Sequence, residues 1–207
     1  MITQLFATTI CNVAKLITGM RAVWCDAPGA QQRIYYANHR SHSDFLLIWA
    51  SLPSEIRAVT RPVAAADYWL KGSIRSYFIT KVFRAVLIER NSNTFPPSSN
   101  PLERMDEALT SGESLIMFPE GTRNLEDDLL PFKAGIYHLA KAHPQTEIVP
   151  VWLENLGRVM PKGKVIPVPL LCSLTFGSPL TITESETKET FLARARDALI
   201  ALAPQTA

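Results

Sequence analysis

A chain of 207 residues is long enough for one domain of ordinary size with a substantial hydrophobic core. Its formal net charge of +2 is too small to indicate a nucleic-acid partner, and a hydrophobic content of 47% is high for a soluble protein. Three cysteines, widely separated and odd in number, give neither a disulfide framework nor a metal-ligand spacing. No apolar run reaches the roughly 18 residues that cross a bilayer, so we expect the chain not to span one.

The first predicted element is an amphipathic helix at residues 2–20. We treat residues 1–24 as this segment and residues 25–207 as the main domain, and the helix lacks the charged leader and cleavage site of a signal peptide. Either it packs on the domain or it lies in a membrane interface. We favour the membrane, because a mainly uncharged helix covers a soluble surface poorly. Apolar residues recur with the 3.6-residue helical period at Ile2, Leu5, Phe6, Ile10, Val13, Leu16, Ile17 and Met20.

A histidine and a carboxylate lie between the next strand and helix. Residues 34–37 form an apolar run typical of a buried strand, and residues 45–50 begin a helix. Asp44, in the first helical turn, is placed to accept the imidazole N–H of His39, which would make the other ring nitrogen a general base. Ser41-x-x-Asp44 is also a capping box, a helix-start signal without catalytic content. This motif alone leaves both interpretations open.

Predicted strands and helices alternate along the rest of the chain. Strand patterns lie at residues 57–64, 85–88, 114–118, 148–152 and 170–176. Helical patterns lie at residues 74–82, 102–110, 136–142 and 191–202, with loops at 91–101 and 157–169. Pro150 places its strand near a sheet edge or a bulge, because proline lacks an N–H. The alternation predicts an α/β fold with a single mixed, largely parallel sheet flanked by helices.

The stretch from residue 57 to residue 90 is basic and rich in aromatic residues. Two acidic residues, Asp67 and Glu89, face seven cations along it. This composition suits an anionic membrane surface or a phosphorylated ligand, and a solvated basic face is the alternative. The cations are Arg57, Arg61, Lys71, Arg75, Lys81, Arg84 and Arg90.

Three predicted strands are followed by unusual polar groups, and ligand sites in α/β sheets gather beyond strand ends. The first group is the His39–Asp44 pair, the second is Arg90, and the third is residues 120–123. In the third group, Gly121 allows the backbone to approach a ligand closely. The hydroxyl of Thr122 and the guanidinium of Arg123 suit phosphate oxygens. For either arginine taken singly, a salt bridge to a neighbouring glutamate is the simpler interpretation.

The ordered set of motifs resembles the four blocks of the glycerolipid acyltransferase superfamily, and specifically the bacterial lysophosphatidic acid acyltransferases. The resemblance covers residues 33–180, and the segment around Lys133 is similar to the family's sequence after its third block. Glu89 stands where an aspartate is common, and Asn124 stands where a serine is common. The matching blocks are Asn38-His39 with Asp44, Glu89-Arg90, Phe118-Pro119-Glu120-Gly121-Thr122-Arg123, and Val149-Pro150-Val151.

This resemblance implies transfer of a fatty acyl group from a thioester, acyl-CoA or acyl-carrier protein, to the free hydroxyl of a lysophospholipid. Lysophosphatidic acid is the favoured acceptor, and the product is then phosphatidic acid. His39 is implied as the general base and Asp44 as the group that orients it. No metal and no cofactor beyond the acyl donor are implied. The residues implied in acceptor binding are Arg90, Glu120, Gly121, Thr122 and Arg123, with Lys133 as a weaker candidate.

Other functions are weighed beside this one. A hydrolase with Ser41 or Ser43 as nucleophile lacks the G-x-S-x-G elbow. A metal site built from His39, His42 and Asp44 has no further ligands to complete it. A non-enzymatic lipid-binding module would explain the basic stretch and the helix, but not the His–Asp spacing. We therefore expect a peripheral or monotopic acyltransferase on the cytoplasmic face of the cell membrane, whose oligomeric state the sequence does not indicate.

Overall fold

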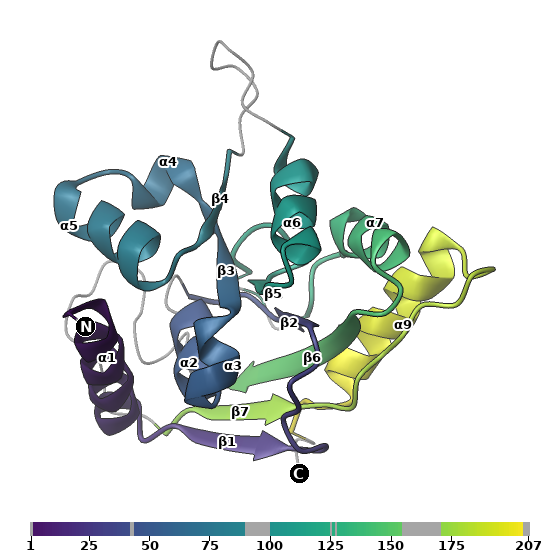
Figure 1. Cartoon of the computed structure of the whole chain (residues 1–207). Helices are drawn as coiled ribbons and strands as arrows, with labels where there is room; N and C mark the ends of the chain where they lie inside the picture. The colour runs from purple at the N-terminus through teal and green to yellow at the C-terminus, as the bar shows by residue number, and fades with distance from the viewer. Residues whose placement is uncertain are drawn as a thin grey trace.

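The computed structural model describes residues 2–41, 44–89, 100–124, 126, 128–154 and 171–204. In this part of the chain, seven strands form one sheet in the order β1-β7-β6-β2-β5-β3-β4, and the β6–β7 pair alone is antiparallel. The predicted α/β fold with a mixed, largely parallel sheet is confirmed (Figure 1). The strands are β1 (Arg21–Trp24), β2 (Arg33–Ala37), β3 (Thr60–Ala65), β4 (Val86–Ile88), β5 (Ser114–Met117), β6 (Glu147–Glu154) and β7 (Ser173–Phe176).

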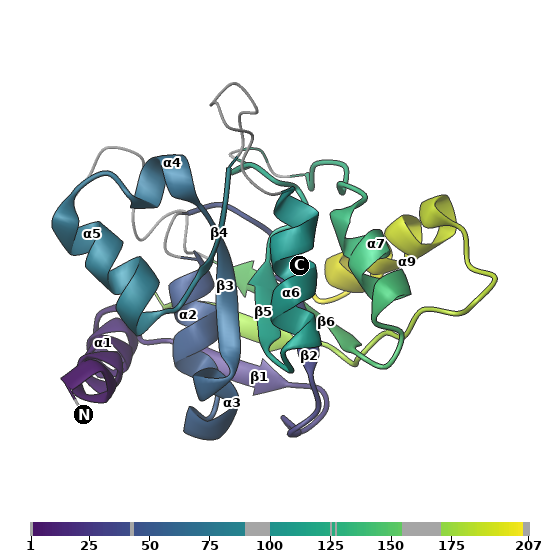
Figure 2. The ribbon, with the colours of Figure 1, turned by 45° about the horizontal axis from the view of Figure 1, so that its top comes forward.

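Helices cover the two faces of this sheet. One face packs against α1 (Ile2–Thr18), α2 (Asp44–Ser51) and the π-helix η1 (Phe78–Val82). The other face packs against α6 (Pro101–Thr110), α7 (Gly135–Ala142) and α9 (Lys188–Ile200). The shorter helices are α3 (Ser54–Ala58), α4 (Ala66–Trp69) and α5 (Ser73–Tyr77). Figures 1 and 2 both show α1, α4 and α5 on one side of β3 and β4, with α6, α7 and α9 on the other.

The strand β2 shows why this sequence makes a two-faced core. Side chains alternate across a strand, and all five residues of β2 are buried. Tyr35 packs in the core beneath α1 and α2, whereas Ile34 and Tyr36 pack in the core beneath α6, α7 and α9. Burying a large apolar side chain is worth roughly 1.5–3 kcal/mol, so this strand anchors both layers.

Element boundaries differ from the predictions in a few places. Residues 54–58 form α3, so β3 begins at Thr60, three residues later than the predicted strand. Neither α4 nor the edge strand β1 is predicted from the sequence, and β1 ends where we place the boundary of the N-terminal segment. The predicted loops at 91–101 and 157–169 lie outside the described residues, except for residues 100 and 101.

Pro150 lies in an interior strand, so of the two predicted positions, a sheet edge or a bulge, the sheet edge is wrong. The ladder between β6 and β7 begins at Val151, and the next bridge on that side joins Ile148 to Leu180. The Pro150 carbonyl accepts a hydrogen bond from the Gly177 N–H at 2.9 Å. The missing N–H therefore falls in a break between two stretches of pairing, where no ladder hydrogen bond is lost.

The N-terminal helix α1 is present, and it packs on the domain. Its inner face is made by the small residues Cys11, Ala14 and Thr18, which are buried against α2 and its neighbours. Much of the predicted apolar stripe faces outward, and Leu16 is 85% exposed. Within the residues that the structure describes, no helix has both the length and the apolar character needed to cross a membrane.

Candidate active site

His39 and Asp44 face each other in the turn between β2 and α2. The Nδ1 atom of His39 lies 2.9 Å from Oδ2 of Asp44, which is the first residue of α2. If Nδ1 donates its proton to this carboxylate, Nε2 carries the lone pair that accepts a proton. The ring of His39 also stacks on Phe118, with the centroids 4.2 Å apart and the planes at 19°. The carboxylate and the phenyl ring together hold the imidazole in one orientation.

The carboxylate of Asp44 is completely buried. Its Oδ2 atom also accepts hydrogen bonds from the backbone N–H groups of Arg40, at 2.7 Å, and Ser41, at 2.8 Å. Burial raises the pKa of Asp44, and the hydrogen bonds from His39 and the two backbone groups oppose this increase. Asp44 thus closes the turn before α2 and binds the imidazole at the same time, so the contacts that both interpretations require are present, and the catalytic role stays a prediction.

Glu120 lies beneath this turn. It is 3% exposed, its Oε1 atom accepts the backbone N–H of His39 at 2.9 Å, and its Oε2 atom accepts that of Leu130 at 3.0 Å. Both carboxylate oxygens are therefore engaged by the backbone, and Glu120 is absent from the residues that line the neighbouring cavity. Its contact with an acceptor stays a prediction, whereas its contact with the His39 backbone is a feature of the structure.

Two asparagines to which the sequence analysis assigns no role hold the ends of these strands. The buried side chain of Asn38 donates to the Leu153 carbonyl at 2.9 Å and accepts the Leu153 N–H at 2.8 Å, which ties β2 to β6. The backbone N–H of Asn124 donates to the carbonyl of His39 at 2.7 Å. Both backbone groups of His39 are thus bound by the segment that follows β5.

Gly121 lies in the same segment and lines the neighbouring cavity. Its φ angle is +70°, and its N–H closes a turn onto the carbonyl of Phe118 at 3.0 Å. A Cβ atom at this position would lie 2.5 Å from Cε of Lys133, so the lysine side chain crosses directly over the glycine. The backbone N–H of Lys133 is held by the Pro119 carbonyl at 2.8 Å. Only glycine combines this backbone angle with room for the lysine.

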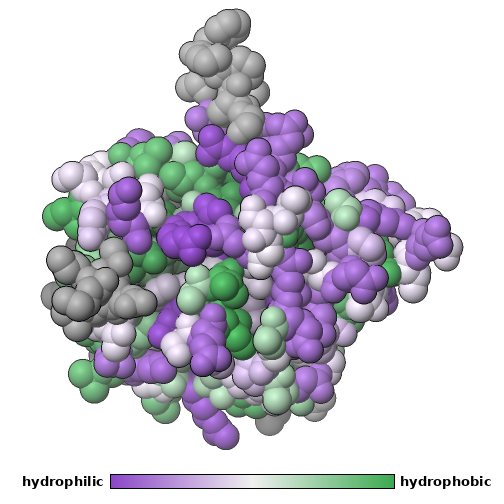
Figure 3. Space-filling view, in the orientation of Figure 1, coloured by the Kyte–Doolittle hydropathy of each residue, from purple (hydrophilic) through white to green (hydrophobic). Residues whose placement is uncertain are grey.

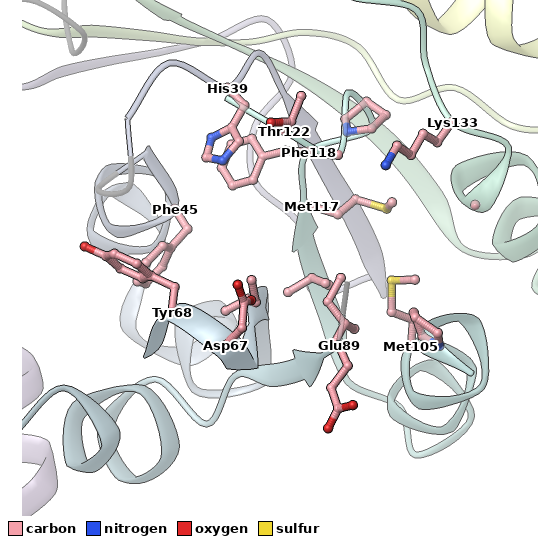
Figure 4. A pocket seen from close by; sticks show the side chains of 18 of the residues that line it. His39, Phe45, Asp67, Tyr68, Glu89, Met105, Met117, Phe118, Thr122 and Lys133 are labelled. Carbon is pink, nitrogen blue, oxygen red and sulfur yellow. The ribbon is translucent and has the colours of Figure 1, made fainter. Parts of the chain in front are cut away.

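A cavity of about 840 Å³ opens beside the dyad. His39, Thr122 and Lys133 lie at one end of it, and Asp67 and Met105 lie at the other, as Figure 4 shows. Much of the wall between them is apolar and comes from the ends of β3, β4 and β5 together with α4 and α6. This is the carboxyl edge of the parallel strands, where ligand sites in such sheets are expected.

The predicted site residues fall into three groups. His39, Gly121, Thr122, Arg123 and Lys133 line the cavity. Asp44 and Glu120 are buried behind it and hold His39 in place. Arg90 lies outside the described residues, so the proximity of the two predicted arginines stays a prediction. Among the described residues, no three His, Cys, Asp or Glu side chains gather to form a possible metal site.

The arrangement defines a class of protein: an α/β protein with a hydrogen-bonded His–Asp pair, cationic side chains and an apolar cavity at the carboxyl edge of its sheet. The acyltransferase family profile matches residues 24–154, which is more than half of the chain. The chain therefore belongs to the acyltransferase family.

Individual relatives agree with this assignment. A 1-acyl-sn-glycerol-3-phosphate acyltransferase of Limnanthes douglasii is 34% identical over 143 residues, which cover 68% of this chain and 48% of the plant protein. The alpha form of the same enzyme from Homo sapiens is 33% identical over 128 residues, covering 62% and 42%. The chain thus spans less than half of the length of these curated relatives.

The fold also matches a solved structure. The crystal structure of the 1-acyl-sn-glycerophosphate acyltransferase PlsC from Thermotoga maritima superposes with a TM-score of 0.73. The match covers 94% of this chain and 76% of the other, at 20% sequence identity. At this level of identity the similarity shows a shared fold.

Proposed function

We propose that this protein transfers a fatty acyl group from a thioester donor, acyl-CoA or acyl-carrier protein, to the free hydroxyl of a lysophospholipid. Lysophosphatidic acid is the favoured acceptor, giving phosphatidic acid. The observation that carries the proposal is the 2.9 Å contact between His39 Nδ1 and Asp44 Oδ2 at the wall of a cavity that Arg123 and Lys133 also line. The names of the relatives support the choice of acceptor.

In the proposed reaction, Nε2 of His39 takes the proton of the acceptor hydroxyl as its oxygen attacks the thioester carbonyl carbon. The new C–O bond gives a tetrahedral intermediate, which collapses by breaking the C–S bond. The imidazolium then returns its proton to the departing thiolate, so no oxidant or reductant is needed. Asp44 stabilises the imidazolium through Nδ1, and general-base catalysis of this kind contributes roughly 10²–10⁴-fold.

Acceptor binding is proposed for the cationic end of the cavity. The planar guanidinium of Arg123 matches phosphate oxygens, and Lys133 and the Thr122 hydroxyl add further donors beside it. Anchoring the phosphate fixes the reacting hydroxyl next to the imidazole, an orientation effect that can exceed the contribution of the base itself. Arg90 is proposed as a second phosphate ligand from its place in the sequence alone.

A serine hydrolase is less well supported. Ser41 is 5% exposed and does not line the cavity, while its backbone N–H is bound to Asp44. Ser43 lies outside the described residues. A lipid-binding module without catalysis would not require a carboxylate that is completely buried and bonded to an imidazole, because such a group is costly to bury.

The test is an acyl-transfer assay with radiolabelled acyl groups and protein purified in detergent. Acyl-CoA and acyl-carrier protein are each combined with lysophosphatidic acid and with lysolipids that lack a phosphate monoester. We expect labelled phosphatidic acid from the wild-type protein and a decrease of at least a hundredfold for His39→Ala. Labelled fatty acid as the single product would identify a hydrolase, and unchanged transfer by His39→Ala would exclude the proposed base.

A further inference from the structure

Residues 66–82, which comprise α4, α5 and η1 and which we call the arm, carry large apolar side chains on their outer side. Ile74 is 74% exposed, Leu70 is 48% exposed and Tyr77 is 40% exposed. Ile74 and Tyr77 are three residues apart on α5, so they share one face of that helix, and Leu70 lies at the end of α4, before the turn at Gly72. Ile74 and Tyr77 therefore form an exposed apolar strip on α5, and Leu70 adds an exposed apolar side chain at the end of α4.

The arm is firmly attached to the domain by its other side. Ile79 and Val82 of η1 are buried in the core beneath α1 and α2. Phe6 of α1 packs edge-to-face against Tyr77 at 6.4 Å and Phe78 at 6.1 Å between ring centroids. Phe6 is itself 41% exposed and extends the strip onto α1. The inner side chains of the arm therefore stabilise the fold. The outer strip is an exposed apolar patch of the kind that marks an interaction site.

The cations of the basic stretch divide into arginines that bind other parts of the domain and the exposed cations of the arm. Arg61 and Arg84 both pair with Glu113, and Arg57 lies over the ring of Trp49 at 5.2 Å, so these three arginines serve the fold. The three cations of the arm, Lys71, Arg75 and Lys81, are exposed. With Asp67 as its one acidic residue, the arm has a net charge of +2, which equals that of the whole chain.

The arm is also part of the wall of the cavity. Tyr68, Trp69 and Lys71 line the cavity, while Leu70 and Ile74 face outward directly beside them. Arg75 lies over the ring of Tyr68 at 5.3 Å, which links the cationic surface to the wall. Figure 3 shows hydrophobic side chains interleaved with hydrophilic ones over α4 and α5, in the orientation of Figure 1.

We propose that the arm, together with Phe6, docks on the surface of a bilayer that contains anionic phospholipid. Apolar and aromatic side chains flanked by cations are the composition of an interfacial membrane segment, and anionic headgroups complement the positive charge of the arm. This inference rests on the proposed function, because it places the cavity against the leaflet that holds a lysophospholipid acceptor. The arm would thereby admit the acceptor directly from the membrane.

The test compares binding of the full chain to vesicles of phosphatidylcholine alone and of phosphatidylcholine with phosphatidylglycerol, by co-sedimentation. Ile74→Ser with Tyr77→Ser removes the apolar strip, and Arg75→Gln with Lys81→Gln removes the charge. Ile200→Ser is the matched control, because Ile200 is 40% exposed on α9, on the other side of the sheet. Leu16→Ser tests whether the exposed side of α1 binds instead.

We expect the wild-type protein to prefer anionic vesicles and to release them at high salt. The apolar double variant should bind at least tenfold more weakly, the charge variant should lose the preference for phosphatidylglycerol, and Ile200→Ser should behave as wild type. Equal binding by all variants, or a loss confined to Leu16→Ser, would overturn the assignment to the arm. A protein partner that covers the strip should compete with vesicles for the arm. A partner that binds the strip while vesicles stay bound would contradict the assignment to the arm.

Activity separates this inference from the proposed function. An acceptor with a short acyl chain, dissolved as monomers, reaches the cavity without a membrane, whereas a long-chain acceptor is presented in vesicles. The apolar double variant should keep wild-type turnover on the monomeric acceptor and lose at least tenfold on the vesicle-bound one. Absence of transfer to both acceptors by the wild-type protein would refute the proposed function and leave the vesicle-binding result to stand on its own.

Discussion

Glu120 offers the sharpest test of how the site is built, because its carboxylate has two separate backbone donors. Oε1 accepts the N–H of His39 at 2.9 Å, and Oε2 accepts the N–H of Leu130 at 3.0 Å. Glu120→Gln keeps the shape of the side chain but replaces one oxygen with an NH₂ group. One of the two backbone N–H groups then faces the new NH₂ group, which is also a donor. One of the two buried hydrogen bonds is therefore lost.

The expected cost follows from these contacts. A hydrogen bond to a charged group contributes about 1.5–3 kcal/mol, and leaving a buried donor unpaired costs about 1–3 kcal/mol more. Removing a buried charge offsets part of this cost, so we expect a net decrease of about 2–4 kcal/mol in the free energy of unfolding. For a chain of this length, each kcal/mol shifts the midpoint of thermal unfolding by about 2–4 °C. The midpoint should therefore fall by roughly 4–16 °C.

Urea unfolding and acyl-transfer kinetics measure the two consequences. If Glu120 positions His39, Glu120→Gln lowers both stability and kcat and leaves the KM for the acceptor nearly unchanged. If Glu120 instead binds the acceptor, as the resemblance implies, the KM rises and stability is unaffected. Glu126→Gln, an exposed change in the same loop, is the matched control and should alter neither quantity. Wild-type stability in Glu120→Gln would refute the positioning role.

The remaining predictions concern other parts of the molecule. Gly121→Ala should lower the free energy of unfolding by about 1–2 kcal/mol in urea titrations, because its φ is +70° and the new Cβ meets Lys133. Asp44→Asn should lower kcat by roughly 10²–10⁴-fold in steady-state assays, because the charge that stabilises the imidazolium is lost. Arg123→Ala should raise the KM for a phosphate-bearing acceptor by roughly 10–100-fold and leave the KM for the thioester unchanged. Arg194 holds the pKa of Glu186 below its usual range, so this ion pair stabilises the fold above the usual carboxyl pKa. Glu186→Gln should therefore lower the midpoint of thermal unfolding at neutral pH, and the difference should disappear as the pH falls through the depressed pKa.

The interior strands are predictable from the sequence, because the burial of each strand on both faces is visible in its own residues. Residues 34–37 and 115–118 are continuous apolar runs, which is what a parallel strand covered on both faces requires. The edge strand β1 gives no such signal, since its exposed and half-buried residues alternate over only four positions. Its partner β7 lies about 150 residues away in the chain, so the pairing is visible only in three dimensions.

The candidate site is predictable in its side chains and not in its backbone contacts. The His39–Asp44 pair is local, and a spacing of five positions across a helix start suffices to propose it. The roles of Glu120 and Asn124 depend on the N–H and C=O groups of a residue some 80 positions earlier. Every residue has such groups, so residue type does not identify the partner. This is why the sequence predicts neither of these contacts, although the family resemblance implies acceptor binding for Glu120, which stays a prediction.

The contacts around His39 show how the first and third blocks depend on each other. The capping box and the proposed catalytic pair share one oxygen, Oδ2 of Asp44, so the first motif has the same sequence whichever role it serves. The segment after β5 separates the two roles. Glu120 binds the N–H of His39, the N–H of Asn124 binds its carbonyl, and Phe118 stacks on its ring. A helix start alone needs none of these contacts, whereas a base that must keep its position relative to a bound hydroxyl needs all of them. The third block therefore holds His39, the proposed base of the first block, and Arg123 and Lys133 of the same segment line the cavity where the acceptor is proposed to bind.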